Sequence, residues 1–345
     1  MKQIKRTGCY QWLQSLVNEI EEYQMKNNLI LLIYRWAKIG LFCALIFSLL
    51  GYLGSYFQYF ELVSHFRLQY FVVAAIVLVL FILKMDWKWC FLTICCLVIN
   101  GIEVIPWYYS GAGESTISTD NTAKYLRVLH ANVHTNNKEY SRIIKLINTE
   151  KPDLVFLQET DGKWLNAMKE IESEFPFQIF SPRSDNFGIA LYSRIPFVDS
   201  KIIEDFSQSF LPSIYIEIEV QNKIVSILST HPLPPVGVRY FEERNFQLDK
   251  VAEFLSNKPH EKILIGDLNA TMWSPYFNKL IQKTGMINVR KGIGILPSWP
   301  TNLPFLKIPL DHCLVGKAIR IVGVKLGDNI GSDHLPLIVD LAIKR

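Results

Sequence analysis

Polar side chains of a few types stand at the ends of one apolar segment after another in the C-terminal two-thirds of the chain. They are Asn132, Glu159, His231, Asp267, Asn269, Asp311, Asp333 and His334. Rigid scaffolds present functional groups from such strand ends. Oxygen donors without clustered cysteines favour a hard cation such as Mg²⁺ or Mn²⁺. Any one of these residues alone is most often a turn former or a cap, so their number and order carry the prediction.

These residue types suit the hydrolysis of a phosphate ester. The reaction needs a nucleophilic water, neutralised charge on the phosphoryl oxygens and a stabilised leaving oxygen, and a divalent cation can serve the last two needs. A histidine held by a carboxylate has a fixed tautomer and a raised pKa, which suits proton transfer near neutrality. Asn269 offers hydrogen bonds without adding negative charge beside an anionic substrate. The sequence therefore predicts an enzyme, a metal-dependent hydrolase acting on phosphate ester bonds.

The segments that hold these residues alternate apolar strands with amphipathic helices. Helical spacing of apolar residues predicts helices over 140–148 and 239–255. Strands are expected over 125–132, 153–158, 188–193, 213–220, 223–230 and 262–266, and around 310–315, 320–325 and 337–343. Because strands outnumber helices in roughly 220 residues, we expect two facing sheets with helices outside. This is a four-layered α/β/β/α sandwich of the α/β (α+β) class.

Seven short stretches follow one another in an order that resembles a known family. They are HANVH around Asn132, DLVFLQET, GIALYSR, STHP, GDLNA, LDHCLV and GSDHLP, and they extend over about residues 125–343. In types and order they resemble the endonuclease/exonuclease/phosphatase (deoxyribonuclease I-like) superfamily. The stretches GDLNATMWSP and THPLPP are similar to membrane-bound bacterial members of unassigned substrate. The resemblance implies a catalytic domain over residues 123–345.

The resemblance also implies a metal site. Glu159 would be the principal ligand of Mg²⁺ (or Mn²⁺), and Asn132 would assist at the same ion directly or through water. By the same resemblance, Asp333 would be a further carboxylate of this metal site.

The remaining roles implied by the resemblance concern proton transfer and phosphate binding. His334 would contact the scissile phosphate or accept a proton, with Asp311 orienting its ring. Asp267 and Asn269 would position the attacking water and a phosphate oxygen. His231 would stabilise the transition state or protonate the leaving group. Whether Asp267 or the His334–Asp311 pair is the general base is left open.

The apolar excess of the chain lies before residue 110. Apolar segments at 39–60, 68–83 and 89–109 approach the length of about 20 residues that a membrane-crossing helix needs, so three transmembrane helices are predicted over 29–109. The middle one is short but flanked by Arg67 and Lys84, which can reach the membrane surface. Residues 1–28 are expected to be a cytoplasmic helix, either on the membrane surface or solvated, and 110–122 a linker.

Basic residues near the spans predict the orientation. Lys26, Arg35 and Lys38 precede the first span, and Lys84 and Lys88 lie in the second loop. The positive-inside rule then places both regions in the cytoplasm. Three spans put the C-terminal domain on the periplasmic or outer side of a bacterial inner membrane, in a multi-pass protein, whereas two spans would reverse this.

The substrate class stays open at this stage. A net charge of +4 is too small to imply a nucleic-acid partner, and no basic stripe with interleaved aromatics is present. Attachment to a lipid bilayer favours a phospholipid or sphingomyelin, but an anchored nuclease acting on DNA or RNA is equally physical. Leu310, Asp311 and His312 stand where inositol-polyphosphate 5-phosphatases carry a Cys-Asp-Arg type of triplet, which counts against that subclass.

Two other function classes are weighed against hydrolysis. A catalytically inactive, membrane-tethered scaffold could use the same fold, and a transport component would need polar groups in the spans, where only Glu103 occurs. Two further regions could bear on the substrate. The Pro-rich stretch 296–309 predicts a rigid loop that shapes the substrate mouth. Four arginines could bind phosphate, although solvated surface positions are expected for most of them: Arg183, Arg194, Arg239 and Arg244.

Overall fold

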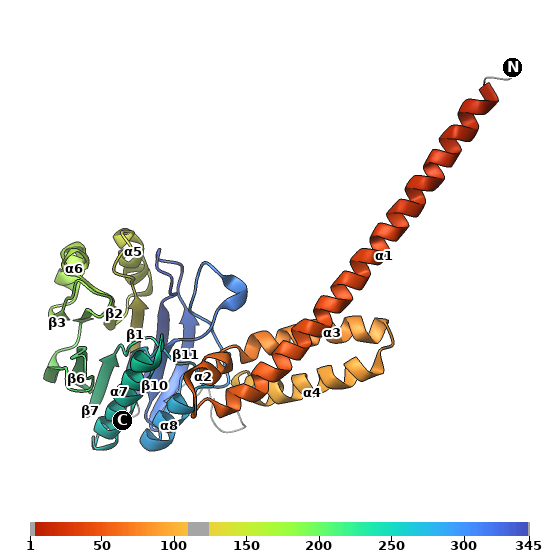
Figure 1. Cartoon of the computed structure of the whole chain (residues 1–345). Helices are drawn as coiled ribbons and strands as arrows, with labels where there is room; N and C mark the ends of the chain where they lie inside the picture. Colours follow the sequence, from red (N-terminus) through yellow and green to blue (C-terminus); the bar gives the residue numbers. More distant parts are fainter. Residues whose placement is uncertain (1–3, 110–123, 344–345) are drawn as a thin grey trace.

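A computed structural model of the chain describes residues 4–109 and 124–343. The predicted linker 110–122 lies outside the described residues. Helices at the N-terminal side run away from a C-terminal body of two sheets, which we call the sandwich (Figure 1). These helices are α1 (Ile4–Leu50), η1 (Gly51–Leu53), α2 (Gln58–Ser64), α3 (Arg67–Leu83), α4 (Trp87–Val104) and η2 (Ile105–Trp107).

Two described helical segments are long and apolar enough to cross a membrane, Ser15–Leu53 and Trp87–Trp107. The pair α2 and α3, bent by 56°, would make a third span if it is counted as one. The first segment ends earlier than the sequence predicts, because the chain folds back onto α2 after Leu50. A Cβ on Gly54 would lie 3.0 Å from the Cα of Glu61, so glycine permits this close approach.

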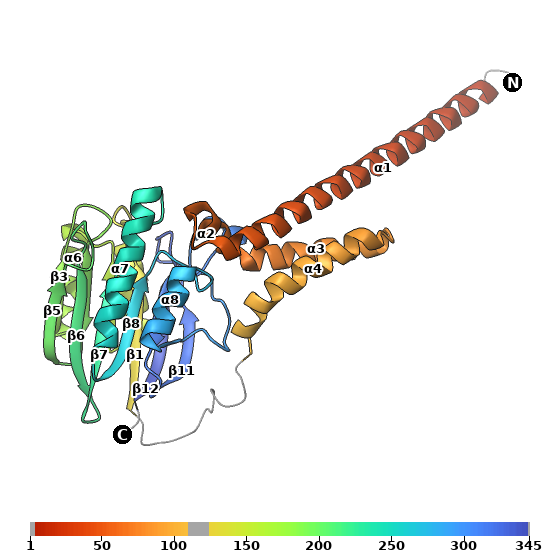
Figure 2. The same ribbon diagram turned by 60° about the horizontal axis from the view of Figure 1, so that its bottom comes forward.

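The hairpin of α3 and α4 packs beside the C-terminal half of α1, and we call these three helices the bundle (Figure 2). Its interior contains a polar contact, in which Asn100 Nδ2 donates to Ser48 Oγ at 2.8 Å. Arg67, at the start of α3, is buried within the protein, and its guanidinium donates to the Ser48 carbonyl at 2.8 Å. Residues 15–33 of α1 are exposed over their whole length. The bundle therefore uses only the second half of α1.

The sandwich consists of two six-stranded sheets. The first has the order β11-β12-β1-β2-β4-β3 and the second β5-β6-β7-β8-β10-β9. The strands of the first sheet are β1 (Lys124–Asn132), β2 (Leu154–Gln158), β3 (Phe177–Ser181), β4 (Ile189–Ser193), β11 (Ile319–Leu326) and β12 (Leu337–Ile343). Those of the second are β5 (Phe197–Ile203), β6 (Ser213–Val220), β7 (Lys223–Thr230), β8 (Glu261–Asp267), β9 (Ile287–Asn288) and β10 (Asp311–Val315).

Three apolar clusters separate four layers. Side chains such as Val128 and Ile265 fill the space between the sheets. The outer face of the first sheet is covered by α5 (Tyr140–Glu150) and α6 (Gly162–Met168). The outer face of the second is covered by α7 (Val238–Ser256) and α8 (Pro275–Thr284), as Figure 2 shows. The predicted α/β/β/α fold class is confirmed. The short helices η3 (Lys169–Glu174) and η4 (Pro304–Leu306) lie in connections.

The sheet topology brings the predicted site residues to one edge. Strands β1 and β2 are parallel, as are β7 and β8, so their carboxyl ends point the same way within each sheet. Strand β12 is antiparallel to β1 and β10 is antiparallel to β8, so these two strands begin where the others end. Asp311 is thereby placed directly opposite Asp267 in the register of β10 and β8.

The bundle and the sandwich share one apolar cluster. Val104 of α4 is buried among the side chains between the second sheet and α7 and α8, and Phe71 and Trp107 pack against the same cluster. Trp273 Nε1 also donates to the carbonyl of Glu103 at 3.0 Å. The helical region is therefore joined to the sandwich by packing as well as by the chain.

Candidate active site

A buried chain of hydrogen bonds links the two sheets at the site edge. His130 and Asn132 lie two residues apart on β1, so both face the second sheet. His130 Nε2 is 3.0 Å from Asp311 Oδ1, and His334 Nδ1 is 2.8 Å from Asp311 Oδ2. One carboxylate thus orients two imidazoles, and all three side chains are buried. The Nε2 atom of His334 is left to face the cavity.

Asp267 stands between two imidazoles. Its Oδ2 lies 3.4 Å from His231 Nε2, 3.6 Å from His334 Nε2 and 3.2 Å from Asn132 Nδ2. Burial alone would raise the pKa of Asp267, but the two nearby histidines hold the pKa below its usual value. Burial alone would lower the pKa of His334, but Asp311 and Asp267 raise that pKa to about 10. Asp267 is therefore an ionised acceptor and His334 a cation in this arrangement.

The loop after β8 supplies the amide of the site. Asn269 has a positive φ of 48°, and its backbone N–H donates to Asp267 Oδ1 at 3.0 Å, which fixes the turn. Its Nδ2 donates to the Pro232 carbonyl at 2.9 Å and lies 3.4 Å from His231 Nε2. Burial would lower the pKa of His231, and the adjacent Asp267 raises that pKa above its ordinary value. The loops after β7 and β8 therefore hold each other in place.

A strained residue presents the main carboxylate. Glu159 follows β2 with a φ of 62°, a left-handed conformation that non-glycine residues adopt at a cost of about 1–3 kcal/mol when the surroundings enforce it. Asn132 Nδ2 donates to its Oε1 at 2.8 Å. Gly188 allows this turn to pack, because a Cβ there would lie 1.9 Å from the Thr160 carbonyl oxygen.

Glu159 and Asp333 lie near the same ring nitrogen of His134, in the part of the site that includes Asn132. The Nδ1 atom of His134 lies 3.6 Å from Glu159 Oε2 and 3.6 Å from Asp333 Oδ1. Two carboxylates that face the same point repel each other unless a cation lies between them. Carboxylate and amide oxygens are ligands that Mg²⁺ accepts. The donor set of Glu159, Asn132 and Asp333 therefore fits a hard divalent cation.

A second group of metal-ligand types is also compact. One ligand atom each from Asp267, Asp311 and His334 lies within 4.8 Å of the others. Both oxygens of Asp311 are, however, occupied by His130 and His334 at hydrogen-bond distance. An ion there would have to displace these bonds, so the set around Glu159 is the better fit for a metal.

These groups form the floor of one cavity with a volume of about 770 Å³. Six of the eight sequence-predicted residues line it directly: Glu159, His231, Asp267, Asn269, Asp333 and His334. Asn132 and Asp311 lie behind them, buried and bonded to Glu159 and His334 respectively. Trp299 and Ile308 of the Pro-rich stretch are also in the lining, so this stretch lies at the mouth as expected.

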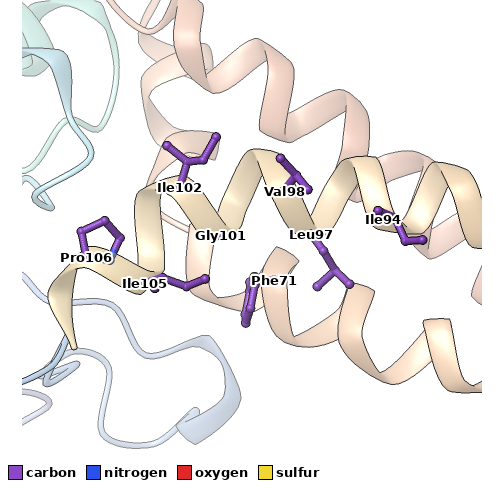
Figure 3. A pocket seen from close by; sticks show the side chains of 8 residues that line it. All are labelled: Phe71, Ile94, Leu97, Val98, Gly101, Ile102, Ile105 and Pro106. Carbon is purple, nitrogen blue, oxygen red and sulfur yellow. The ribbon is translucent and has the colours of Figure 1, made fainter. Parts of the chain in front are cut away.

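A second hollow, of about 640 Å³, lies on α3 and α4, away from these groups (Figure 3). Phe71, Leu97, Val98 and Ile105 are among the side chains that form it, and its described lining holds no titratable residue. It offers apolar surface but no chemistry.

Two histidines of this region, His130 and His134, are not among the predicted site residues, and Arg244 lies elsewhere than expected. His130 reads as part of an apolar strand, yet its position two residues before Asn132 places it on the same face. His134 lies two residues after Asn132, in the loop that bonds Glu159. Arg244, expected at a solvated surface, is fully buried and donates to the Asn269 carbonyl at 2.9 Å. Of the other predicted arginines, Arg183 and Arg194 pair with Asp185 and Glu174.

The residues that carry this site fall within one family model. The match to the endonuclease/exonuclease/phosphatase family extends over residues 129–334, more than half of the chain. The chain belongs to the endonuclease/exonuclease/phosphatase family. This family includes metal-dependent phosphoesterases, nucleases and phosphatases among them, and its enzymes use divalent metals.

Solved structures show the same fold at low identity. TDP2 of D. rerio complexed with a single-strand DNA product is 16% identical with a TM-score of 0.53, covering 63% of this chain and 99% of that one. The human Nocturnin catalytic domain with a bound sulfate anion is 18% identical with a TM-score of 0.53, covering 65% and 98%. A functionally unknown conserved protein from Enterococcus faecalis V583 is 17% identical with a TM-score of 0.54, covering 64% and 100%. No curated protein matches the chain.

Proposed function

We propose that this chain is a membrane-anchored, divalent-metal-dependent phosphoesterase that hydrolyses a phosphate ester by attack of water. The observation that carries the proposal is the joint placement of His334, oriented by Asp311 at 2.8 Å, and Asp267 and Glu159 in one cavity. A scaffold that only binds partners does not need a buried carboxylate between two imidazoles, because burying such charges is unfavourable unless they serve a purpose.

Each side chain has a proposed part in the reaction. The imidazolium of His334 binds a phosphoryl oxygen through Nε2, since Asp311 accepts its Nδ1–H. The ionised Asp267 accepts the proton of the attacking water at Oδ2, which faces the same space. Asn269 donates to a second phosphoryl oxygen, and His231 gives a proton to the leaving oxygen.

The metal site of the proposal comprises Glu159, Asn132 and Asp333, with Mg²⁺ or Mn²⁺ as the ion. When bound there, the ion would neutralise charge on the phosphoryl oxygens. Glu159 is held for this task by Asn132 at 2.8 Å, and the strained φ of Glu159 directs its carboxylate into the cavity.

The test uses the purified full chain in lipid nanodiscs with bis(p-nitrophenyl) phosphate, plasmid DNA, sphingomyelin and phosphoinositides. DNA is included because the TDP2 of D. rerio contains a DNA product. We expect turnover with Mg²⁺ or Mn²⁺, its loss with EDTA, and a fall of at least about a hundredfold in Glu159→Gln and His334→Gln. Val198→Asn, on exposed β5, is the matched control. A folded, metal-loaded protein that turns over none of these substrates would favour the scaffold.

The membrane topology is a second part of the proposal. We propose three spans within 29–109, with the bent pair α2 and α3 counted as one of them, which would put the domain 123–345 on the periplasmic or outer side of a bacterial inner membrane. The turn between α3 and α4 lies at the end of the bundle away from the sandwich (Figure 2), and Lys84 and Lys88, which belong to this turn and the start of α4, support this side by the positive-inside rule. In a cysteine-free background, Val322→Cys should react with a membrane-impermeant maleimide in intact cells. Labelling only after lysis would reverse the orientation.

A further inference from the structure

The cavity of the proposed active site is partly built by the helical region. Tyr59, Leu62 and His65, from α2 and the residue after it, line it together with the catalytic groups of the sandwich. In Figures 1 and 2, α2 lies between the sandwich and the bundle. The wall of the cavity is thus continuous with the helices proposed to cross the membrane.

Buried polar contacts fix α2 in this position. Arg244 Nη2 donates to Glu61 Oε2 at 2.8 Å, and both side chains are fully buried. Ser274 Oγ donates to Glu61 Oε1 at 2.5 Å, and His65 Nδ1 shares a hydrogen bond of 2.9 Å with Thr271 Oγ1. A buried ion pair whose other hydrogen-bonding positions are also satisfied fixes the position of α2, because separating the partners would leave each as an unpaired buried charge. The wall is therefore a built part of the cavity.

The end of the bundle next to α2 marks a membrane surface. Helix α3 begins at Arg67 beside α2 and its 17 residues extend about 26 Å, close to the thickness of a hydrocarbon core of about 30 Å. Gln69, in its first turn, donates to the carbonyl of Lys307 at 2.7 Å. The loop held by this bond carries Phe305 with 90% of its surface exposed, and Leu303 and Leu306 are exposed beside it. Apolar side chains at this level suit the interfacial layer of a bilayer.

The walls of the cavity are apolar above a polar floor. Leu62 and Tyr59 of α2 face the same space as Val236, two residues before α7, and Tyr240 in its first turn. Phe187 and Trp299 complete this wall. Val236 is 75% exposed, so an apolar side chain stands open at the mouth. The lining includes no Lys or Arg among the described residues, but it includes four carboxylates: Glu159, Asp185, Asp267 and Asp333. Nucleic-acid sites use basic side chains along the backbone, and this cavity lacks them.

We infer that the substrate is a membrane lipid whose phosphate ester binds at the floor of the cavity while its apolar chain lies against Tyr59, Leu62, Val236 and Tyr240. The lipid reaches the cavity from the bilayer surface at which the bundle ends. This inference rests on the proposed phosphoesterase function and names its substrate class. Helix α2 acts as the lipid-binding wall.

The first experiment measures chain-length dependence with simple probes. The full chain in nanodiscs is assayed with bis(p-nitrophenyl) phosphate while butyl, octyl or decyl phosphate is added as inhibitor. We expect the inhibition constant to fall at least about tenfold from butyl to decyl phosphate, because each buried methylene adds affinity. In Leu62→Asn and Val236→Asn this ratio should shrink toward one. Val198→Asn should keep the wild-type ratio, which corrects for partition of the probes into the nanodisc. An unchanged ratio in both wall variants overturns the inference.

Binding is also measured without turnover, so that the two proposals fail separately. The melting temperature of the chain is recorded with saturating butyl or decyl phosphate, and decyl phosphate should raise it more in wild type than in Val236→Asn. Since Val236 is exposed, this variant is expected to fold. If the wild-type chain shows this larger shift with decyl phosphate but does not hydrolyse bis(p-nitrophenyl) phosphate, the proposed enzymatic function fails and the proposed lipid site stands. The proposed lipid site fails if butyl and decyl phosphate raise the melting temperature equally. It also fails if the chain cleaves DNA but forms no product from vesicles of phosphatidylglycerol and phosphatidic acid.

Discussion

Two buried polar networks in this molecule differ in how well their charges are matched. At the cavity floor, Asp267 meets two imidazoles at 3.4 and 3.6 Å, longer than direct hydrogen bonds. At the junction with α2, Glu61 meets Arg244 and Ser274 at 2.8 and 2.5 Å. The floor faces an open cavity, whereas the junction is closed on all sides. The floor is thus arranged for groups that must still bind something, and the junction for groups that only hold the fold.

The largest effect should come from the floor. Asp311→Asn should lower kcat about a thousandfold or more, because a neutral amide no longer stabilises the imidazolium of His334 or holds its ring in place. The melting temperature should change much less than in a junction variant. Steady-state kinetics with bis(p-nitrophenyl) phosphate and thermal unfolding measure the two quantities. A variant that keeps wild-type kcat would mean that the network at the floor is structural.

Substitutions at the junction with α2 should lower the stability of the chain. Glu61→Ala leaves the guanidinium of Arg244 buried and unpaired, so we expect a loss of about 3–5 kcal/mol in the free energy of unfolding. The double variant Glu61→Met, Arg244→Met removes both charges and should lose clearly less. Unfolding in nanodiscs compares the three proteins. If the double variant is as unstable as Glu61→Ala, the charge argument for the junction fails.

His312 lies on β10 next to Asp311 but on the other face of the second sheet from the cavity floor. It follows Asp311 on β10 and so faces the opposite side of the sheet, where Nε2 donates to the Ala270 carbonyl at 2.9 Å. Burial and the nearby Arg290 lower the pKa of His312 to about 3. The folded chain therefore keeps this imidazole neutral, while the unfolded chain protonates it below about pH 6.5.

The stability contributed by a neutral His312 is present above pH 6.5 and is lost as the pH falls toward 3. Between pH 6.5 and 5, wild type should lose about 2 kcal/mol more than His312→Gln. Denaturant unfolding at several pH values tests this difference. Parallel curves for the two proteins would show that His312 is not protonated on unfolding in this range.

The smallest effect is expected on α1. Lys26 and Glu22 form an exposed pair at 2.6 Å on the part of α1 that projects beyond the bundle. Lys26→Ala should change the free energy of unfolding by less than about 0.5 kcal/mol, because exposed pairs contribute little. It serves as the reference for Glu61→Ala in the same unfolding experiment. A loss approaching that of Glu61→Ala would remove the contrast between exposed and buried pairs.

The sequence predicts the sandwich better than the way its parts are joined. Strands such as Ser213–Val220 coincide with their predicted range, because apolar residues recur there at every second position, as Ile214, Ile216 and Ile218 do. Strands β3, β5 and β9 and helices α6 and α8 were not predicted. Helix α8 had a signal, since Ser274 caps it, Pro275 opens it and Gly285 follows it. Strand β3 is five half-buried residues, too short for periodicity to reveal.

In the site, too, the positions of residues along the chain are predicted better than their contacts with distant residues. Each of the eight predicted side chains lies in or directly behind the cavity, because strand ends and chain order are local features. The contacts of His130 with Asp311 and of Glu61 with Arg244 join residues far apart in sequence. Nothing local marks such partners, because a buried charge looks like a surface charge until the fold places its neighbour.

The apolar cluster shared by Val104, Trp107 and the second sheet has a kinetic consequence. If the bundle crosses a membrane as proposed, a body packed onto its end cannot rise or swing freely, so the cavity stays at one height above the bilayer. For a substrate that lies in the bilayer, encounter then becomes a search in two dimensions. The quantity that sets the rate is the number of substrate molecules per unit of membrane area, and dilution by other lipids would slow the reaction even at constant bulk concentration.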